Sequence, residues 1–458
     1  MRLGRVGILL LLGGAAACGS VSRERGHDEV DRLVRERTGH QTRWAQGSPE
    51  DEQVNRWVGE LLAHGLTHSA AVEIALVNNP RLQATYEELG VSQADVVQAG
   101  LLRNPSLGAH IAFPVHGNHD EIQFNLLQDF LDIFVLPLRK QIAQAQFAAD
   151  VLRVAQQALD TIADVQKEYA AVQAGSALVA YRKTVIEAND GAAELSRQLY
   201  AAGNVNAFKA TTQLVTNEEA ALDLTRDELE LLRHRERLNR LLGLWGPRAD
   251  WTIAEELPPL PPADPPLEHL EALAMKQRLD VDAARKQRLL MAKALGLARR
   301  TRFVGRLDVG VDAHQDADGP RVIGPSLYLE LPIFDQRQAM IARLEAQARQ
   351  AEHRLDAVAI EARSEVRLAR AELIGARQIV ERYQISIVPM RDKALDEAQL
   401  FYNGMLLGLY QLIDIKQAQV MAHAQYIAAL RDYWSARADL ERAVGGQISK
   451  PTNATGDK

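Results

Sequence analysis

The sequence predicts a mainly α-helical chain with a small amount of membrane-type β-structure, built from two copies of an internal repeat. Gln198-Leu199 precedes Gly203, and Gln399-Leu400 precedes Gly404, with each glycine between two long helical patterns. Aromatic residues make up only 5% of the chain while hydrophobic residues make up 47%, which favours long, closely packed helices over a large β-sandwich. We interpret each glycine as the tip of a helical hairpin, where glycine accepts a positive φ without strain.

Bulk properties exclude several classes of protein. At 458 residues the chain has room for two or three domains, and a formal net charge of −7 provides no basic surface for nucleic acid. The single cysteine, Cys18, excludes an intrachain disulfide framework and a cage of thiolate metal ligands. Phosphate-binding glycine loops and serine nucleophile elbows are absent from the sequence. We therefore predict neither an enzyme nor a bound cofactor, and no nucleic-acid partner.

The first residues have the features of a bacterial lipoprotein signal. Arg2 and Arg5 provide positive charge, residues 6–12 are apolar, and the small residues end in Ala15-Ala16-Ala17-Cys18, which resembles a lipobox. We predict that residues 1–17 are a signal peptide and that Cys18 is acylated, with palmitate among its chains. The residues after Cys18 lack the aspartate that commonly retains lipoproteins in the inner membrane, so we expect the outer membrane. The alternative is a plain secretory signal followed by a free cysteine.

The mature chain begins with an arm and a first structural repeat. Residues 18–68 are charged and without a strong period, so we expect a lipidated extended arm with one short helix. Residues 69–246 form the first repeat, and Ser69 is the expected cap of its first helix. The expected elements are a helix over 69–102, strands over 107–115 and 121–130, and helices over 139–202 and 207–242.

A second repeat covers residues 268–446, after a proline-rich, stiff connector at 247–267. The expected elements are a helix ending near 302, strands over 306–313 and 322–333, a long helix from Arg337, and a return helix ending at Gly445. Their order, spacing and type match the first repeat, which predicts an internal two-fold duplication. Residues 447–458 are polar and are expected to be a disordered tail.

The clearest helical period lies in the second repeat. Its apolar residues step by four and three in turn: Ala362, Val366, Ala369, Leu373, Ala376, Val380, Tyr383 and Ile387. This 3.5-residue period predicts a coiled-coil seam in which small alanines allow close approach. Pro389 follows the seam, and we expect it to bend the helix or to shift its hydrogen-bond ladder.

The four expected strands pose a physical problem. Open sheet edges have unpaired backbone groups that find no partner in lipid, so four strands cannot span a membrane as an isolated sheet. Three copies of four strands give twelve, a number that can enclose a channel. The predicted fold class is therefore mainly α with membrane β: a trimeric twelve-stranded β-barrel, four strands per chain, continued by a tube of long helices.

Several motifs resemble those of the TolC-like outer-membrane factors, the outer membrane efflux protein family, in its lipoprotein form. They are Ala75-Leu76-Val77-Asn78-Asn79-Pro80-Arg81-Leu82, Leu329-Glu330-Leu331-Pro332-Ile333-Phe334-Asp335, Tyr402-Asn403-Gly404, Tyr426-Ile427-Ala428-Ala429-Leu430-Arg431-Asp432-Tyr433 and Leu440-Glu441-Arg442-Ala443. The resemblance covers about residues 69–446, nearly the whole mature chain. It implies a homotrimer, an outer-membrane β-barrel, a periplasmic α-helical barrel and an equatorial belt near mid-length, where we place the N-terminal arm, the connector and the tail.

The resemblance also implies a function. The chain would be the outer-membrane channel of a tripartite efflux system in a Gram-negative bacterium, passively conducting heavy-metal ions or drugs. Its partners would be a periplasmic adaptor (membrane fusion) protein, an inner-membrane pump of RND or ABC type, and outer-membrane lipid. A runner-up is a lipid-anchored periplasmic coiled-coil structural or adaptor lipoprotein without a membrane barrel. The tip from Tyr402 to Leu406 looks like variants associated with copper resistance, although drugs remain equally open as cargo.

By the same resemblance, the two hairpin tips form the periplasmic mouth and contact the adaptor. The expected contact residues are Gly203, Asn204 and Val205 at the first tip, and Gly404, Met405, Leu406 and Leu407 at the second. The first tip is polar and the second apolar. Family members commonly close the mouth with acidic rings or tyrosine contacts after the second glycine. Tyr410 and Asp414 lie one helical turn apart and are the gate candidates, and three copies of Asp414 would form a carboxylate ring.

Histidines provide only a weak indication of metal binding. His110, His116 and His119 lie close together in the sequence at an expected strand and loop, where exposed histidines are common. His64 and His68 have a spacing of four residues but no accompanying hydrolase motif. The sequence therefore predicts no metal site.

Overall fold

The structure of the chain is a computed structural model that describes residues 26–113, 121–253, 255–303, 305–315 and 320–448. These residues divide into two compact units. The strand unit contains residues 26–29, 86–154 and 280–358, and the hairpin unit contains residues 30–85, 155–279 and 359–448, in each case within the described ranges. The predicted signal peptide and lipobox, Cys18, His116 and His119 lie outside the described residues, as do residues 449–458.

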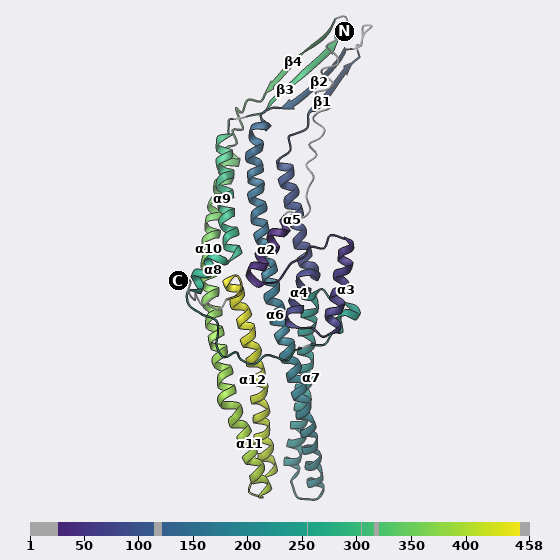
Figure 1. The fold of residues 1–458 in the computed structure, drawn as a ribbon, viewed down its shortest axis with the longest axis vertical. Coiled ribbons are helices and arrows are strands. Elements are labelled where there is room, and N and C mark those ends of the chain that lie inside the picture. Colours follow the sequence, from purple (N-terminus) through teal and green to yellow (C-terminus); the bar gives the residue numbers. More distant parts are fainter. Residues whose placement is uncertain (1–25, 114–120, 254, 304, 316–319, 449–458) are drawn as a thin grey trace, which may run out of the picture. The chain divides into compact units, whose positions relative to one another are not determined.

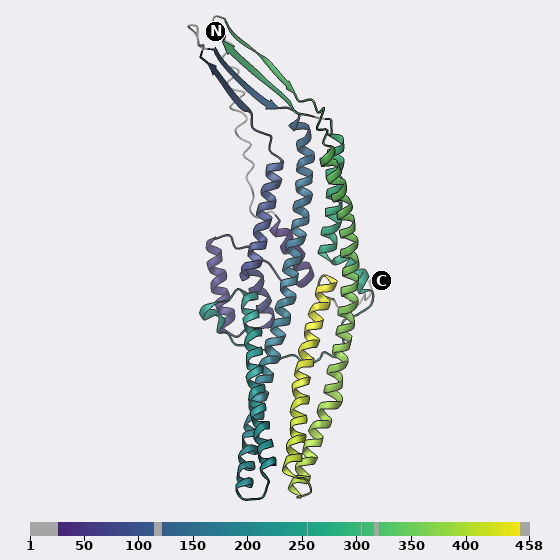
Figure 2. The same ribbon diagram turned by 180° about the vertical axis from the view of Figure 1, so that it is seen from behind.

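Long helices dominate both units, and the strands form one sheet (Figures 1 and 2). The helices are α2 (His27–Thr38), α3 (Pro49–Ala63), α4 (His68–Asn78), α5 (Pro80–Ala99), α6 (Asp132–Ala201), α7 (Ala207–Leu242), α8 (Leu270–Gln277), α9 (Leu279–Arg300), α10 (Gln338–Arg382), α11 (Val388–Asn403) and α12 (Leu409–Val444). The strands are β1 (Ser106–Ala112), β2 (Glu121–Asp129), β3 (Leu307–Gln315) and β4 (Arg321–Leu329). In the described part of the chain, no helix is both long and apolar enough to cross a membrane.

The single helix expected over 69–102 is wrong, because the chain breaks at Asn79 into α4 and α5. Pro80 disfavours helical geometry in the residue before it, and Asn79 is extended with ψ 114°. Its side-chain Oδ1 accepts the backbone N–H of Arg81 at 2.8 Å and so begins the new helix. Ser69 is not the cap of α4: Thr67 is, and its hydroxyl accepts the N–H of Ala70 at 3.2 Å.

Two further helix boundaries differ from expectation. The N-terminal arm contains two helices, α2 and α3, rather than one short helix. α6 begins at Asp132, seven residues before the expected start at Arg139, and it includes Pro137. The Arg139 guanidinium donates to both carboxylate oxygens of Asp132, at 3.0 and 3.2 Å, which joins the first turns of the helix. A proline near a helix start removes a single N–H donor, and this ion pair helps to offset that loss.

The sheet lies in the strand unit and is antiparallel in the order β1-β2-β3-β4. Directly opposed residues share a face, so the register assigns every side chain to one of two faces. One face carries the apolar rows Leu107–Leu126–Val311–Pro325 and Ala109–Phe124–Ala313–Ile323. Most of its large apolar side chains are exposed. The opposite face carries mostly polar residues, with Asn125 opposite Asp312 and Gln123 opposite His314.

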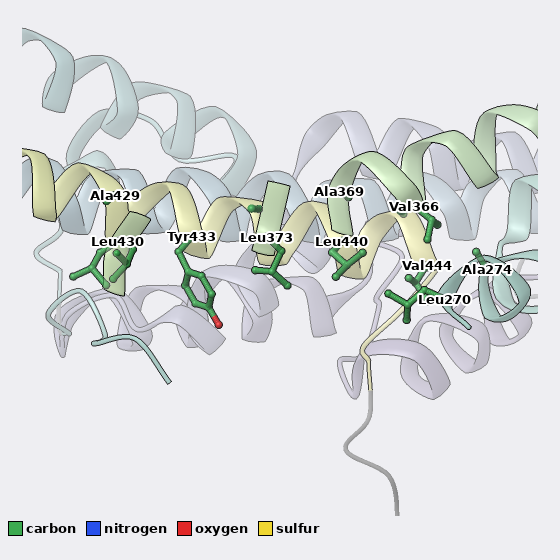
Figure 3. Close-up of a cluster of buried hydrophobic side chains, with 13 residues drawn as sticks. Leu270, Ala274, Val366, Ala369, Leu373, Ala429, Leu430, Tyr433, Leu440 and Val444 are labelled. Atoms are coloured by element: carbon green, nitrogen blue, oxygen red, sulfur yellow. The ribbon is translucent and has the colours of Figure 1, made fainter. Parts of the chain in front are cut away.

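The predicted coiled-coil seam of α10 is confirmed by burial. Its residues join a buried cluster with α8 and α12 in the hairpin unit (Figure 3). The cluster includes Leu373 and Tyr433, which are fully buried on facing helices. The effect expected of Pro389 is also present: the helix passes through a π-helical turn at Tyr383–Ile387 just before the proline. A proline clashes with the carbonyl one turn earlier, and the wider turn accommodates that clash.

Candidate functional site

The two hairpin turns lie at the same end of the hairpin unit (Figures 1 and 2). In the first turn, the N–H of Gly203 donates to Tyr200 O at 2.9 Å and the N–H of Asn204 donates to Leu199 O at 2.8 Å. In this turn Gly203 has φ 75°, as expected for glycine at a helix C-terminus. Asn206 then caps α7, because its Oδ1 accepts the N–H of Lys209 at 2.9 Å.

The second turn has the same backbone hydrogen bonds. The N–H of Met405 donates to Tyr402 O at 3.0 Å, and the N–H of Leu406 donates to Phe401 O at 2.8 Å. Met405, with φ 62°, therefore occupies the position that Gly203 occupies in the first turn. The expectation that Gly404 adopts a positive φ is wrong, because its φ is −79°.

Side chains at the second turn are strongly exposed. Met405 is 94% exposed and Leu406 is 77% exposed. Asn204 and Val205 provide a smaller surface at the first turn, with Asn204 exposed and Val205 half-buried. The second tip is therefore more apolar than the first in its accessible surface as well as in its sequence. Exposed apolar groups at the end of a hairpin are suited to contact with another protein.

Just beyond the turns, one of the two gate candidates joins the hairpins to each other. The Oη of Tyr410 on α12 lies 2.9 Å from the Oγ of Ser196 on α6, and Ser196 is completely buried. The ammonium of Lys209 on α7 lies 5.6 Å from the centre of the Tyr410 ring, within cation–π range. Asp414, the other candidate, is exposed on α12, and no ion pair in the described part of the chain involves it.

Further along the hairpins, a second set of polar side chains lies where α6, α11 and α12 meet. The rings of Tyr181 and His423 are 5.6 Å apart, and His423 Nε2 lies 2.9 Å from Asp392 Oδ1. The amide of Gln419 donates to the same oxygen at 2.7 Å. Burial raises the pKa of Asp392, but the hydrogen bonds from His423 and Gln419 outweigh it, so the pKa lies below its usual range. The charged carboxylate is therefore stabilised in this place.

The proline-rich connector is bound across α10 and α12. Asp264 accepts from Arg377 Nε at 2.7 Å and from the Tyr433 hydroxyl at 2.6 Å, and Arg377 also donates to Pro261 O at 2.6 Å. Burial and the hydrogen bond to Asp264 raise the pKa of Tyr433 to about 12. The bond to Asp264 likewise raises the pKa of Arg377. The indole of Trp434 donates to Pro258 O at 3.0 Å, so Pro258, Pro261 and Asp264 attach the connector through side chains of α10 and α12 within seven residues of chain.

The chain is 24% identical over 395 residues to the cobalt-zinc-cadmium resistance protein CzcC of Cupriavidus metallidurans, which covers 83% of this chain and 90% of the relative. It superposes on the Campylobacter jejuni CmeC outer membrane channel with a TM-score of 0.73 at 15% identity, over 84% of this chain and 87% of that one. A membrane protein from Pseudomonas aeruginosa gives a TM-score of 0.69 at 20% identity, over 83% and 93% of the two chains. The chain has the fold of the TolC-like outer-membrane channels.

The TolC-like fold agrees with the resemblance in the motifs and with the expectation of a channel component rather than an enzyme. No protein-family model matches the chain. The coiled-coil alternative without a membrane barrel is not favoured, since it does not require the four strands that pair here. Among the described residues, no group of three or more His, Cys, Asp or Glu side chains converges to hold a metal ion.

The structure brings together several residues of this TolC-like fold that no sequence pattern indicates. Ser196 and Lys209 contact Tyr410 from the first hairpin, and Asp264 holds Arg377 and Tyr433. None of these pairs has a sequence signal, because the partners are more than a hundred residues apart and belong to no motif. Asp264 stands out in the sequence only as an acidic residue among the prolines of the connector.

Proposed function

We propose that this chain is the outer-membrane channel of a tripartite efflux system, located in the outer membrane of a Gram-negative bacterium with a periplasmic helical extension. It passively conducts cargo delivered by an inner-membrane pump, of RND or ABC type, through a periplasmic adaptor. The observation that carries the proposal is the four-stranded sheet with one exposed apolar face and one polar face. That division is the pattern of strands that face lipid on one side and an aqueous lumen on the other.

A homotrimer completes the sheet. In the described part of the chain, β1 and β4 are the two edges of the sheet and each has a strand partner on one side only. Such edges are unacceptable in lipid, and three copies of four strands close into a twelve-stranded barrel that removes them. The long helices of the three copies form the periplasmic barrel. Both halves of the chain run through two helices, two strands and a long hairpin, which supports the internal duplication.

The domain organisation follows from this arrangement. Residues 18–68, which precede the first repeat, and the connector at 247–267, which separates the repeats at 69–246 and 268–446, belong to an equatorial belt. The attachment of the connector to α10 and α12 through Asp264 supports its place in that belt. Residues 1–17 are removed as a signal peptide, and the lipid on Cys18 anchors the mature chain.

The two turns form the periplasmic mouth. Gly203, Asn204 and Val205, together with Gly404 and the apolar run from Met405 to Leu407, contact the adaptor. Tyr410 and Asp414 gate the mouth: Tyr410 holds the two hairpins of one copy together, and the exposed Asp414 side chains of three copies form a ring of carboxylates. The hydrogen bond of Tyr410 to buried Ser196 supports the first of these roles.

The cargo is a heavy-metal ion or a drug, and the similarity to a cobalt-zinc-cadmium resistance protein supports divalent metal ions. A deletion strain tests the function: loss of the gene sensitises cells to the cargo of the system, and the intact gene restores resistance. The same strain with a Cys18→Ser gene separates the anchor from the channel, because the barrel itself holds the trimer in the membrane. Sensitivity that is unchanged across a panel of metals and drugs would reject an efflux role.

A further inference from the structure

Exposed apolar side chains continue past the end of the sheet at which β3 and β4 join α9 and α10. The apolar face ends there in the opposed pair Leu307–Leu329. Just beyond it, Phe334 is 91% exposed between β4 and α10, and Phe303 is 64% exposed between α9 and β3 (Figure 1). The first repeat has an exposed ring at the matching place, since Phe134 lies in the first turn of α6, shortly after β2. Girdles of aromatic residues border the apolar band of membrane β-barrels, so these rings mark one edge of such a band.

Two arginines next to these rings have no acidic partner in the described part of the chain. Arg300 is exposed in the last turn of α9. Arg302 is half-buried, with its guanidinium 4.6 Å from the centre of the Phe303 ring, and its Nη2 donates to the amide oxygen of Gln336 at 3.3 Å. Its Nε is buried without a hydrogen-bond partner. Two positive charges are therefore uncompensated beside exposed apolar rings.

The first repeat shows how the same junction of sheet and helix looks when its charges are paired. Arg103 pairs with Asp129 at 3.6 Å, and Arg139 pairs with Asp132 at 3.0 Å. The uncompensated arginines are therefore particular to the second repeat. Acidic residues close to them in the second repeat have other partners: Glu345 pairs with Arg299, and Asp308 pairs with Arg306.

We propose that Arg300 and Arg302, together with the rings of Phe303 and Phe334, bind the headgroup of an anionic phospholipid. The planar guanidinium matches the oxygens of a phosphate group, and long basic side chains reach from an apolar surface to the headgroup level. The two rings then lie among the upper carbons of the acyl chains. Two uncompensated positive charges favour phosphatidylglycerol, which is anionic, over phosphatidylethanolamine, whose ammonium group offsets its phosphate.

The location of the lipid rests on the proposed function, because it requires the apolar face of the sheet to lie in a membrane. The helices that join the strands then extend into the periplasm, so Phe303 and Phe334 lie at the headgroup level of the periplasmic leaflet. A lipid bound there fixes the depth of the sheet in the membrane.

Native mass spectrometry of the purified full-length protein tests the site, because it reports bound lipid and the number of chains in one measurement. The protein is delipidated in detergent and mixed with phosphatidylglycerol, phosphatidylethanolamine or soluble glycerol phosphate. We expect it to retain phosphatidylglycerol best and glycerol phosphate least. Replacing Arg300 and Arg302 by glutamine should lower retention of phosphatidylglycerol about tenfold or more, since each arginine near a membrane surface contributes about fivefold. Replacing Phe303 and Phe334 by serine should lower retention of both lipids.

Matched controls come from α7 in the hairpin unit. Replacing Arg226 and Arg233 by glutamine removes two exposed arginines, and Phe208→Ser removes an exposed ring, in both cases away from the sheet. We expect both controls to retain lipid as the unaltered protein does. Circular dichroism verifies that each variant is folded, and the exposed Arg300→Gln alone, which disturbs no packing, should already weaken retention.

Equal retention of phosphatidylglycerol by the Arg300/Arg302 double variant and the unaltered protein would overturn the site. Glycerol phosphate bound as well as the lipid would overturn it too, because the arginines would then hold a free phosphate. A trimer that falls apart in the Phe303/Phe334 variant would assign the rings to contact between copies instead of to lipid. A deletion strain that gains no resistance from the intact gene would reject the efflux function without changing the lipid result, so the two failures are distinguishable.

Discussion

Tyr410 Oη lies 2.9 Å from Ser196 Oγ, and this hydrogen bond joins the second helical hairpin to the first. Asn189 on α6 and Gln213 on α7 are further buried polar residues of the first hairpin, and the Nε2 of Gln213 has no hydrogen-bond partner. The seam among α8, α10 and α12 is apolar by contrast, with Leu373 and Tyr433 at its core (Figure 3). A single hydrogen bond contributes less stability than an apolar cluster, so we expect the hairpins to separate first near the turns.

Ser196→Ala should open the mouth. The substitution removes the hydrogen bond and leaves the Tyr410 hydroxyl unsatisfied, at a cost of about 1–3 kcal/mol to the closed arrangement. We expect cells with this variant to become more sensitive to a large hydrophilic antibiotic that the outer membrane otherwise excludes. Tyr200→Phe is the control, because that side chain is exposed at the first turn. Equal sensitivity of the Ser196→Ala and unaltered strains, at equal amounts of protein, would contradict the assignment.

The two tips should differ in their contribution to export. Replacing exposed Leu406 and half-buried Leu407 by serine removes apolar surface that we assign to adaptor contact, whereas Asn204→Ala changes little accessible apolar area. We expect the serine pair to reduce resistance of the strain to its cargo, and Asn204→Ala to leave it nearly intact. An efflux assay in which both variants match the unaltered protein would refute the difference between the tips.

The backbone conformations of Gly203 and Gly404 predict that substitution by alanine destabilises the first turn but not the second. Gly203 has φ 75°, where a side chain is strained, so Gly203→Ala should destabilise its turn by about 1 kcal/mol. Gly404 has φ −79° and no atom closer than 3.5 Å to an added Cβ, so Gly404→Ala should be nearly neutral. Hydrogen exchange of the amides in each turn measures the effect. Faster exchange at Gly404→Ala than at Gly203→Ala would be incompatible with this geometry.

Tyr433 should titrate abnormally through Asp264. Its pKa is raised to about 12, so the protonated form is favoured in the folded state. This contribution to stability is complete below the usual tyrosine pKa of about 10 and is lost as the pH rises toward 12. We expect Asp264→Asn to lower the pKa of Tyr433, as followed by the ultraviolet absorbance of tyrosinate.

Two variants control that titration. Tyr433→Phe should reduce the late-titrating signal by the contribution of one tyrosine, while Tyr169, whose pKa burial also raises, keeps its own late contribution. Asp250→Asn, at an exposed position outside the cluster, should leave the signal in place. A tyrosinate signal that does not change in Asp264→Asn would show that the carboxylate does not act on Tyr433.

Periodicity predicts elements better than it predicts their junctions. The four-and-three spacing of α10 is confirmed because burial of apolar side chains sets both the period and the packing. Residue type does not identify the cap of α4, because Thr67 and Ser69 are both good capping residues. Only the backbone geometry at Thr67, which is extended, decides between them.

The two turns align differently by sequence and by backbone hydrogen bonding. The shared Gln-Leu pairs align Gly203 with Gly404, but the hydrogen bonds align Gly203 with Met405, one residue later. A methionine in the left-handed region is uncommon, so no rule based on residue type would have chosen it. The polar row of the sheet is similar: His110 and His314 share a row only through the register of three strands, which single-strand alternation does not determine.

Planar-bilayer recording of the purified full-length protein tests the central proposal most directly. We expect protein that migrates as a trimer to insert into the bilayer and to produce discrete conductance steps, small for the unaltered protein and larger for Ser196→Ala. Trimeric, folded protein of either kind that inserts without any conductance, or protein that remains monomeric and water-soluble without detergent, would contradict an outer-membrane channel.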